Sequence, residues 1–197
     1  MSERIRRTAF FITHPDVAID PAVPVPQWPL SARGRERMHA ALARPWVRRI
    51  RSIYCSTERK AIDAAAILAE GIGVGFDTHA GLGENDRSSI GYLPKLEFET
   101  LADAFFARPA ESVRGWERAV DAQARIVAAV DTVLRAALPD GDVAIVSHGA
   151  VGALLLCALE GLAISRAQDQ PPGNGGYFYP FDFHTRLLRH GWTAIDA

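Results

Sequence analysis

Two histidines follow apolar segments near opposite ends of this 197-residue chain. His14 closes the run 8–13, and His148 closes the run 142–147. Both runs are predicted to be strands, and ligands bind at the carboxyl ends of strands in an open parallel sheet. If the two strands are neighbours, one imidazole is a candidate nucleophile and the other a candidate partner that stabilises an anion.

Two further segments carry polar groups that could join them. In residues 54–65, Arg59 and Lys60 occupy the first turns of a predicted helix, where cations oppose the helix dipole. An anion bound between these cations and the backbone N–H groups would explain their position, and the alternative is an exposed, solvated helix face. Glu84 lies in the glycine-containing loop 81–87 and could serve as a general acid.

Strands and helices must alternate to position these groups. Period and propensity predict strands at 8–13, 51–55 and 143–146 and a hairpin of 177–183 with 187–195. Helices are predicted after an N-cap at Ser31, after a cap at Ser56 or Thr57, and over 97–106, 113–138 (with Val120 on its apolar face) and 149–159. The alternation predicts a three-layer α/β/α sandwich with a mostly parallel central sheet, formed as a single domain by residues 1–197.

Composition narrows the class of protein. Hydrophobic residues make up 48% and charged residues 23%, which predicts an ordered globular chain, and the net charge of −1 gives no reason to expect nucleic acid or membrane partners. Cys55 and Cys157 lie in apolar stretches and are predicted to be buried thiols. The start of the chain, residues 1–4, shows no secretory signal, and no apolar run is long enough to cross a bilayer, so a cytoplasmic location is expected.

In order along the chain, five segments resemble the motifs of the histidine phosphatase superfamily, which includes the cofactor-dependent phosphoglycerate mutases. That family has Arg-His-Gly after its first strand, Pro-Leu-Thr-x-x-Gly at a helix start, Ser-x-Leu-x-Arg-Ala-x-x-Thr-Ala, Leu-x-Glu, and a late Val-x-His-Gly. The matching segments here are Thr13-His14-Pro15, Pro29-Leu30-Ser31-Ala32-Arg33-Gly34, residues 56–65, Leu82-Gly83-Glu84 and Val146-Ser147-His148-Gly149.

The resemblance implies a role for each of these residues. His14 would attack phosphorus and form a transient phosphohistidine, while Glu84 would protonate the leaving oxygen and then activate water. His148 and Lys60 would stabilise the phosphoryl oxygens. Further substrate contacts are expected from Thr13, Ser56, Arg59 and Gly149, and no metal or cofactor is required.

This chain departs from the family pattern at two cationic positions. Thr13 stands where the family has its first arginine, and Lys60 stands where it has the second. A lysine supplies charge but not the bidentate fork of a guanidinium. Nearby arginines are candidates to compensate, namely Arg33, Arg59 and Arg87.

Three functions are therefore considered. The first is a metal-independent phosphatase that acts on a phosphorylated small molecule or phosphoprotein. The second is a catalytically weak or inactive relative that binds a phosphorylated ligand. The third is a metal hydrolase with His14, Asp16 and His148 as ligands. A mutase is disfavoured, because no feature identifies a bisphosphate activator or a second acceptor site.

Overall fold

A six-stranded sheet forms the centre of the computed structural model, which describes residues 7–197. The strand order is β3-β2-β4-β1-β5-β6. The parallel strands are β1 (Thr8–Thr13), β2 (Ile50–Cys55), β3 (Asp77–Thr78) and β4 (Asp142–Ser147). β5 (Tyr177–Asp182) runs antiparallel to β1, and β6 (Thr193–Ala194) runs antiparallel to β5. The predicted mostly parallel α/β fold is confirmed, while the segment examined for a secretory signal, residues 1–4, lies outside the described residues.

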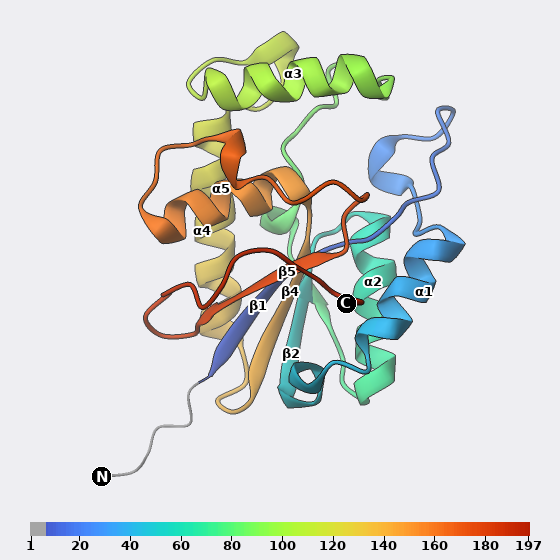
Figure 1. Cartoon of the computed structure of the whole chain (residues 1–197), viewed down its shortest axis with the longest axis vertical. Coiled ribbons are helices and arrows are strands. Elements are labelled where there is room, and N and C mark those ends of the chain that lie inside the picture. Colours follow the sequence, from blue (N-terminus) through green and yellow to red (C-terminus); the bar gives the residue numbers. More distant parts are fainter. Residues whose placement is uncertain (1–6) are drawn as a thin grey trace.

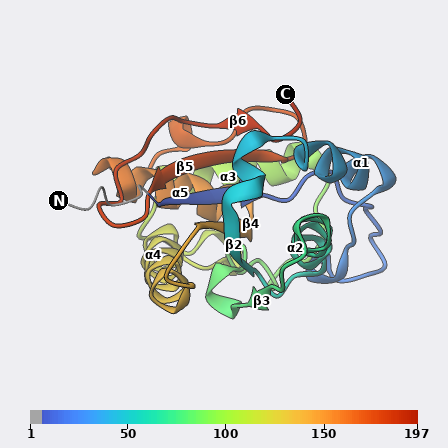
Figure 2. The same ribbon diagram turned by 90° about the horizontal axis from the view of Figure 1, so that it is seen from below.

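Helices cover both faces of this sheet (Figures 1 and 2). α1 (Ala32–Ala41) and α2 (Arg59–Ile72) pack on the face that carries Phe10 and Ile12 of β1. α4 (Ala119–Ala136) and α5 (Gly149–Glu160) pack on the opposite face, which carries Ala9 and Phe11. Successive side chains of a strand point to opposite faces, so β1 contributes to both cores. α3 (Lys95–Ala107) lies across the end of the molecule toward which β1, β2 and β4 run (Figure 1).

The N-caps predicted for α1 and α2 have different outcomes. Ser31 caps α1 as predicted, because its side chain accepts a hydrogen bond from the amide of Gly34. The predicted cap of α2 at Ser56 or Thr57 is wrong, since Glu58 occupies the N-cap position. The Ser56 hydroxyl instead accepts a hydrogen bond from the Glu58 amide, at 3.1 Å, and lies two residues before that N-cap.

The helix predicted at 113–138 is shorter than expected. α4 begins at Ala119, and residues 113–115 form a separate 3-10 turn. Arg114 (φ 50°) and Gly115 (φ 84°) are left-handed, so a continuous right-handed helix cannot pass through them. Val120 therefore lies in the first turn of α4 and is 37% exposed, which corrects its assignment to the apolar face.

The prediction for the two cysteines is confirmed, whereas the predicted C-terminal hairpin is only partly formed. Cys55 and Cys157 are buried free thiols, as predicted. Only part of residues 187–195, the second half of the predicted hairpin, forms a strand. They pair with β5 through β6 and through one isolated bridge between Phe181 and Leu188. Within residues 7–197, no helix has the length and apolar character needed to span a membrane.

Strand register explains which side chains meet at the carboxyl edge of the sheet. β4 lies between β1 and β2, with Thr13 opposite Ser147 and Cys55 opposite Val146. The residue that follows each strand therefore emerges at the same level. This register brings His14, Ser56 and His148 together.

Candidate active site

The two histidines singled out by the sequence are neighbours in the structure. Their ring centroids lie 5.1 Å apart, with the ring planes inclined at 69°. The His14 amide also donates to the carbonyl of Ser147, at 3.1 Å, which fixes the backbone of one histidine beside the other. His148 is fully buried, whereas His14 retains partial exposure.

The His14 ring is held in one orientation by its own loop. Nδ1 lies 2.9 Å from the carbonyl oxygen of Pro15, an arrangement in which Nδ1–H donates and Nε2 carries a free electron pair. Burial, together with the positive charge of Lys60, lowers the pKa of His14 to about 4. The ring is therefore neutral at physiological pH, as a nucleophilic imidazole must be.

His148 contacts the start of α2 through one ring nitrogen. Its Nε2 lies 2.8 Å from the Ser56 hydroxyl oxygen and 3.3 Å from Oε1 of Glu58. Burial lowers the pKa of His148 well below its usual value. Its Nδ1 is buried and has no hydrogen-bond partner among the described residues, so this atom is available to a ligand.

Glu58 links three parts of the site through its carboxylate. Oε2 lies 2.6 Å from Nζ of Lys60, while Oε1 accepts the amide of Glu84 at 3.0 Å and approaches His148. Burial disfavours the ionised carboxylate, but the neighbouring His148 and Lys60 outweigh it and lower the pKa of Glu58 to about 2. The site thus contains a fixed negative charge that was not predicted from the sequence.

The two cations at the start of α2 are both paired with carboxylates. Lys60 is 4% exposed and, besides Glu58, donates to the carbonyl of Val25 at 3.0 Å. Arg59 turns away to Asp63, at 2.7 Å, and its side chain is 60% exposed. The structure therefore brings Lys60 to the site and places Arg59 on the α1 side of the helix.

Glu84 lies at the N-terminus of α5. Its carboxylate oxygens accept the amides of Val151, at 3.1 Å, and Ala150, at 3.3 Å. Burial raises the pKa of Glu84, an effect that the nearby charge of Glu58 reinforces and that Arg87 and the two amides oppose. A carboxyl group with a raised pKa is suited to donate a proton near neutral pH.

Thr13 is fully buried, and its hydroxyl is used inside the protein. The hydroxyl donates to Oε1 of Gln170, at 2.7 Å, and accepts the amide of Tyr177, at 3.1 Å. Nε2 of Gln170 lies so close to Gly149 that a Cβ there would be only 2.5 Å away. Thr13 therefore holds the Gln170 carboxamide in place, and Gly149 leaves room for it.

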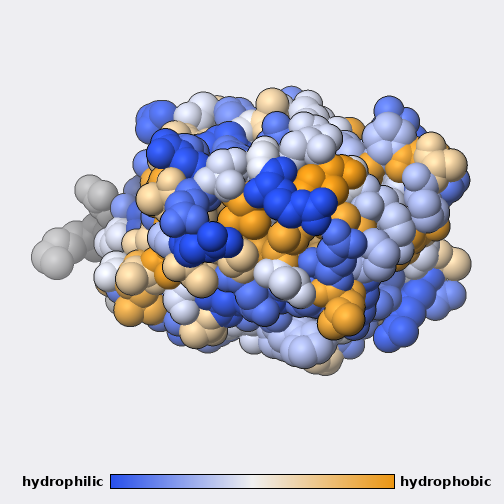
Figure 3. All heavy atoms as spheres, turned by 90° about the horizontal axis from the view of Figure 1, so that it is seen from above, coloured by the Kyte–Doolittle hydropathy of each residue, from blue (hydrophilic) through white to orange (hydrophobic). Residues whose placement is uncertain are grey.

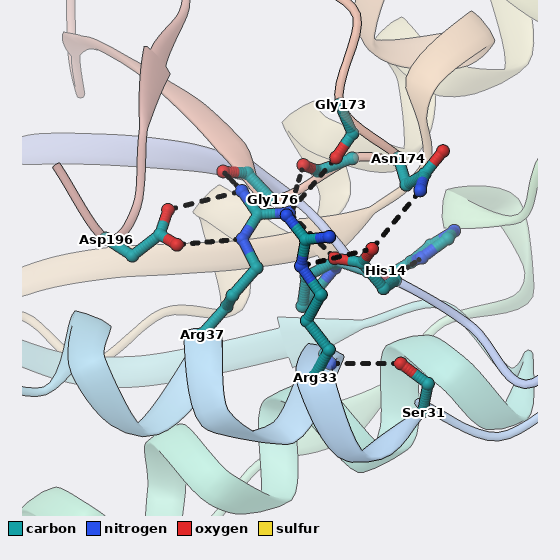
Figure 4. A network of polar contacts seen from close by, with 12 residues as sticks. His14, Ser31, Arg33, Arg37, Gly173, Asn174, Gly176 and Asp196 are labelled. Atoms are coloured by element: carbon teal, nitrogen blue, oxygen red, sulfur yellow. Dashed lines mark hydrogen bonds and ion pairs between the residues drawn. The ribbon is translucent and has the colours of Figure 1, made fainter.

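A polar network fixes the loops on either side of His14 (Figure 4). Arg37 of α1, only 12% exposed, pairs with Asp16 at 3.0 Å and with Asp196 at 2.8 Å. Its guanidinium also donates to the backbone carbonyls of Gly173, Gly175 and Gly176. The Gly176 amide donates to the His14 carbonyl at 3.1 Å, so the network ends on the candidate nucleophile.

Two glycines allow the chain to pass this closely. A Cβ at Gly34 would lie 2.1 Å from the carbonyl oxygen of Asp16, and one at Gly175 would lie 2.1 Å from that of His14. Gly175 also has a left-handed φ of 78°. Both glycines are therefore required by the path of the backbone around His14.

The ligand set considered for a metal hydrolase is not assembled. The Asp16 carboxylate is bound by Arg37 and by Asn174, at 3.2 Å. Across residues 7–197, no group of three His, Cys, Asp or Glu side chains has the geometry to hold a metal ion. Two histidines alone do not make a metal site of the usual kind.

Three residues that the sequence analysis did not select contribute to this site: Glu58, Gln170 and Arg37. Glu58 lies inside the segment that was interpreted through its cations, and an acid at a helix N-terminus is a detectable signal. Gln170 and Arg37 reach the site from loops and helices far away in sequence. No local pattern marks either of them.

Comparison with known proteins adds the family. Residues 24–178 match the model of the histidine phosphatase superfamily (branch 1). The chain belongs to this superfamily. The matched range begins after His14, and no curated protein matches the chain.

Solved structures of the superfamily share the fold of this chain. A mycobacterial glucosyl-3-phosphoglycerate phosphatase superimposes with a TM-score of 0.77 at 23% identity, covering 95% of this chain and 99% of that one. Its complex with inorganic phosphate gives a TM-score of 0.75 at 22% identity, covering 97% and 99%. YhfR of Bacillus stearothermophilus gives 0.77 at 21% identity, covering 94% and 95%.

Proposed function

We propose that this superfamily member is a phosphatase that hydrolyses a phosphomonoester through a phosphohistidine on His14. The observation that carries the proposal is the hydrogen bond from Nδ1 of His14 to the Pro15 carbonyl, at 2.9 Å. It leaves Nε2 unprotonated in a ring whose pKa burial and the charge of Lys60 keep low. His148 beside it offers a buried ring nitrogen without a partner in the described chain.

The reaction proceeds in two displacements. In the first, Nε2 of His14 forms a bond to phosphorus, the ester P–O bond breaks, and Glu84 donates its proton to the leaving oxygen. In the second, the Glu84 carboxylate accepts a proton from water, the water oxygen bonds to phosphorus, and the N–P bond breaks. Glu84 ends protonated, His14 ends neutral, and inorganic phosphate is released.

The remaining groups bind the phosphoryl oxygens. In the tautomer in which Nε2 of His148 accepts the Ser56 hydroxyl, Nδ1–H can donate to a phosphoryl oxygen. Lys60 adds positive charge, and Gln170, which is held by Thr13 and lies against Gly149, lines the site beside His14. No step requires a metal, and the substrate is a phosphorylated small molecule or phosphoprotein. Binding of phosphate and of vanadate by the mycobacterial phosphatase agrees with this ligand class.

Replacement of the nucleophile tests the proposal. His14→Ala should abolish hydrolysis of p-nitrophenyl phosphate and the acid-labile phosphoprotein that an alkaline quench traps. His39→Ala, at an exposed position on α1, is the matched control and should retain full activity. Full turnover by H14A, or turnover abolished by exhaustive chelation, contradicts the mechanism.

A second candidate function rests on the pairing of Lys60 with Glu58 at 2.6 Å and on Thr13 at the arginine position. A site with fewer free cations stabilises the transition state less, so the chain would bind a phosphorylated ligand with little turnover. Phosphate binding without hydrolysis across a panel of aryl and alkyl phosphates would favour this function. Turnover that depends on His14 would exclude it.

A further inference from the structure

The charges around His14 leave the phosphoryl site short of free cations. Lys60 is paired with Glu58 and Arg59 with Asp63. His14 is neutral at physiological pH because burial and the charge of Lys60 lower its pKa. A phosphomonoester brings up to two negative charges, and oriented cations are a main source of its binding and transition-state stabilisation.

Arg87 is a cation of a different kind. It lies on the loop that carries Glu84, and its guanidinium has no hydrogen bond or ion pair within the described part of the chain. It is positioned instead over two aromatic rings, 4.9 Å from the ring centroid of Phe98 and 5.6 Å from that of Trp116. Stacking of this type orients a guanidinium while leaving its N–H groups available.

The charge of Arg87 also acts on the site. Burial is the largest effect on the pKa values of His14 and His148 and lowers both, and the charge of Arg87 lowers them further. Burial raises the pKa of Glu84, and the charge of Arg87 opposes that rise. Glu84, three positions before Arg87, is anchored to the first amides of α5, which fixes the point from which the loop leaves.

The two rings under Arg87 belong to a lobe beyond the carboxyl edge of the sheet, formed by α3 and residues 113–116. Trp116 is 3% exposed and packs with Phe105 of α3, so the platform under Arg87 is part of a packed core. Viewed from this end, the surface shows hydrophobic side chains next to strongly hydrophilic ones (Figure 3). Arg87 is therefore held by the lobe of α3 and not by an opposing carboxylate.

We infer that Arg87 binds a phosphoryl oxygen of the substrate and replaces, from the loop after Glu84, the guanidinium that the superfamily's first motif supplies where this chain has Thr13. The inference rests on the proposed function for its substrate class. It assigns the missing cation to a segment far in sequence from the motif. Compensation by Arg33 is the weaker alternative, because that side chain is 73% exposed and lies 3.8 Å from Asp16.

Direct binding of inorganic phosphate tests this assignment. Isothermal titration of the full chain with phosphate and orthovanadate is compared for wild type, Arg87→Ala, Arg87→Lys and the control Arg108→Ala. Arg108 caps α3 in the same lobe, is 54% exposed and pairs with Glu111. We expect R87A to weaken phosphate binding at least about tenfold, R87K to recover part of it, and R108A to match wild type.

Turnover of p-nitrophenyl phosphate, whose only ionic group is the phosphoryl, provides the second measurement. R87A should lower kcat/KM by at least about tenfold. Equal phosphate affinity in R87A and wild type, including absence of binding in both, overturns the inference. A defect seen only with substrates that carry a second anionic group also overturns it, since Arg87 would then bind the leaving group. Wild type that binds phosphate through Arg87 but hydrolyses nothing contradicts the proposed function and leaves this inference standing.

Discussion

The ammonium group of Lys60 lies 2.6 Å from the Oε2 atom of Glu58, and both side chains are largely buried. Within the candidate site, the position that resembles the second family arginine is thus neutralised by an acid two residues before it. The same carboxylate holds the Glu84 amide and approaches His148. Glu58 therefore offsets the positive charge of Lys60 within the candidate site.

Glu58→Gln should lower the free energy of unfolding by about 1–3 kcal/mol, because it removes the buried ion pair with Lys60 and weakens the hydrogen bond from the Glu84 amide. Added phosphate should then raise the Tm of E58Q more than that of wild type, since the freed ammonium can pair with the ligand. Thermal unfolding with and without phosphate measures both effects. Asp131→Asn, which breaks the distant pair with Arg186, is the control and should show the wild-type phosphate shift. A smaller shift in E58Q would mean that Glu58 aids binding through His148.

The pH profile of kcat/KM should have its optimum on the acid side of neutrality. Activity should rise through the pKa of His14, about 4, as the ring loses its proton. It should fall at higher pH as Glu84 ionises, and burial places the pKa of Glu84 above its usual value. The profile with an alkyl phosphate measures both limbs, whereas p-nitrophenyl phosphate, whose leaving group departs without a proton, measures the acid limb. An acid limb centred near the ordinary histidine pKa would contradict a buried, neutral nucleophile.

Glu84→Gln should separate the two substrates. Loss of the general acid should reduce turnover of an alkyl phosphate by about 10²–10⁴-fold. The first displacement of p-nitrophenyl phosphate should be affected much less, because nitrophenolate leaves without a proton, and burst kinetics report that step. An equal loss of the first step with both substrates would mean that Glu84 acts by capping α5 and not by proton transfer.

Gly175→Ala should impair the site more than Gly73→Ala, although both glycines have left-handed φ values. A Cβ at Gly175 would lie 2.1 Å from the His14 carbonyl oxygen, whereas a Cβ at Gly73 meets nothing within 4 Å. G73A should therefore cost about 1–2 kcal/mol of stability and leave kcat/KM unchanged. G175A should lose further stability and most of its activity. Equal activity of the two variants would show that the loop accommodates the methyl group without moving His14.

Arg37→Ala should loosen the loops beside His14. The side chain is 12% exposed and joins Asp16, Asp196 and the 173–176 backbone (Figure 4). We expect the free energy of unfolding to fall by about 2–4 kcal/mol and hydrogen exchange at the Gly176 amide to become faster. Arg33→Ala on the same helix removes a 73% exposed side chain and should change stability by less than about 0.5 kcal/mol. Unchanged exchange at Gly176 in R37A would contradict the assigned role.

Much of the fold could be predicted because it depends on local patterns. The apolar run of β1 and the Ser31 cap of α1 are each encoded within a few residues. The misplaced start of α4 had a different origin. Arg114 adopts a left-handed conformation that hydrophobic periodicity does not report, and the tight turn before Trp116 follows from tertiary packing.

The candidate site was predictable where a strand end supplied the residue. His14 and His148 do meet, because both follow strands and the strand order and register place those strand ends at one edge. Glu84 comes from the loop after Leu82 and accepts the amides of Ala150 and Val151. Thr13 and Arg59 were predicted as substrate contacts, but their side chains are committed to Gln170 and Asp63. Such commitments depend on which polar partner lies nearest in space, and a single sequence does not contain that information.

The antiparallel pairing of β5 with β1 has a consequence for the order in which the protein folds. The hydroxyl of Thr13 and the amide of Tyr177 are separated by 164 positions, and the neighbouring carbonyl of His14 depends on Gly176. A chain emerging from the ribosome therefore presents His14 long before Gly176 and Tyr177, which hold the backbone and the Thr13 side chain beside it. Contacts this distant form slowly, so onset of phosphatase activity should report the last stage of folding.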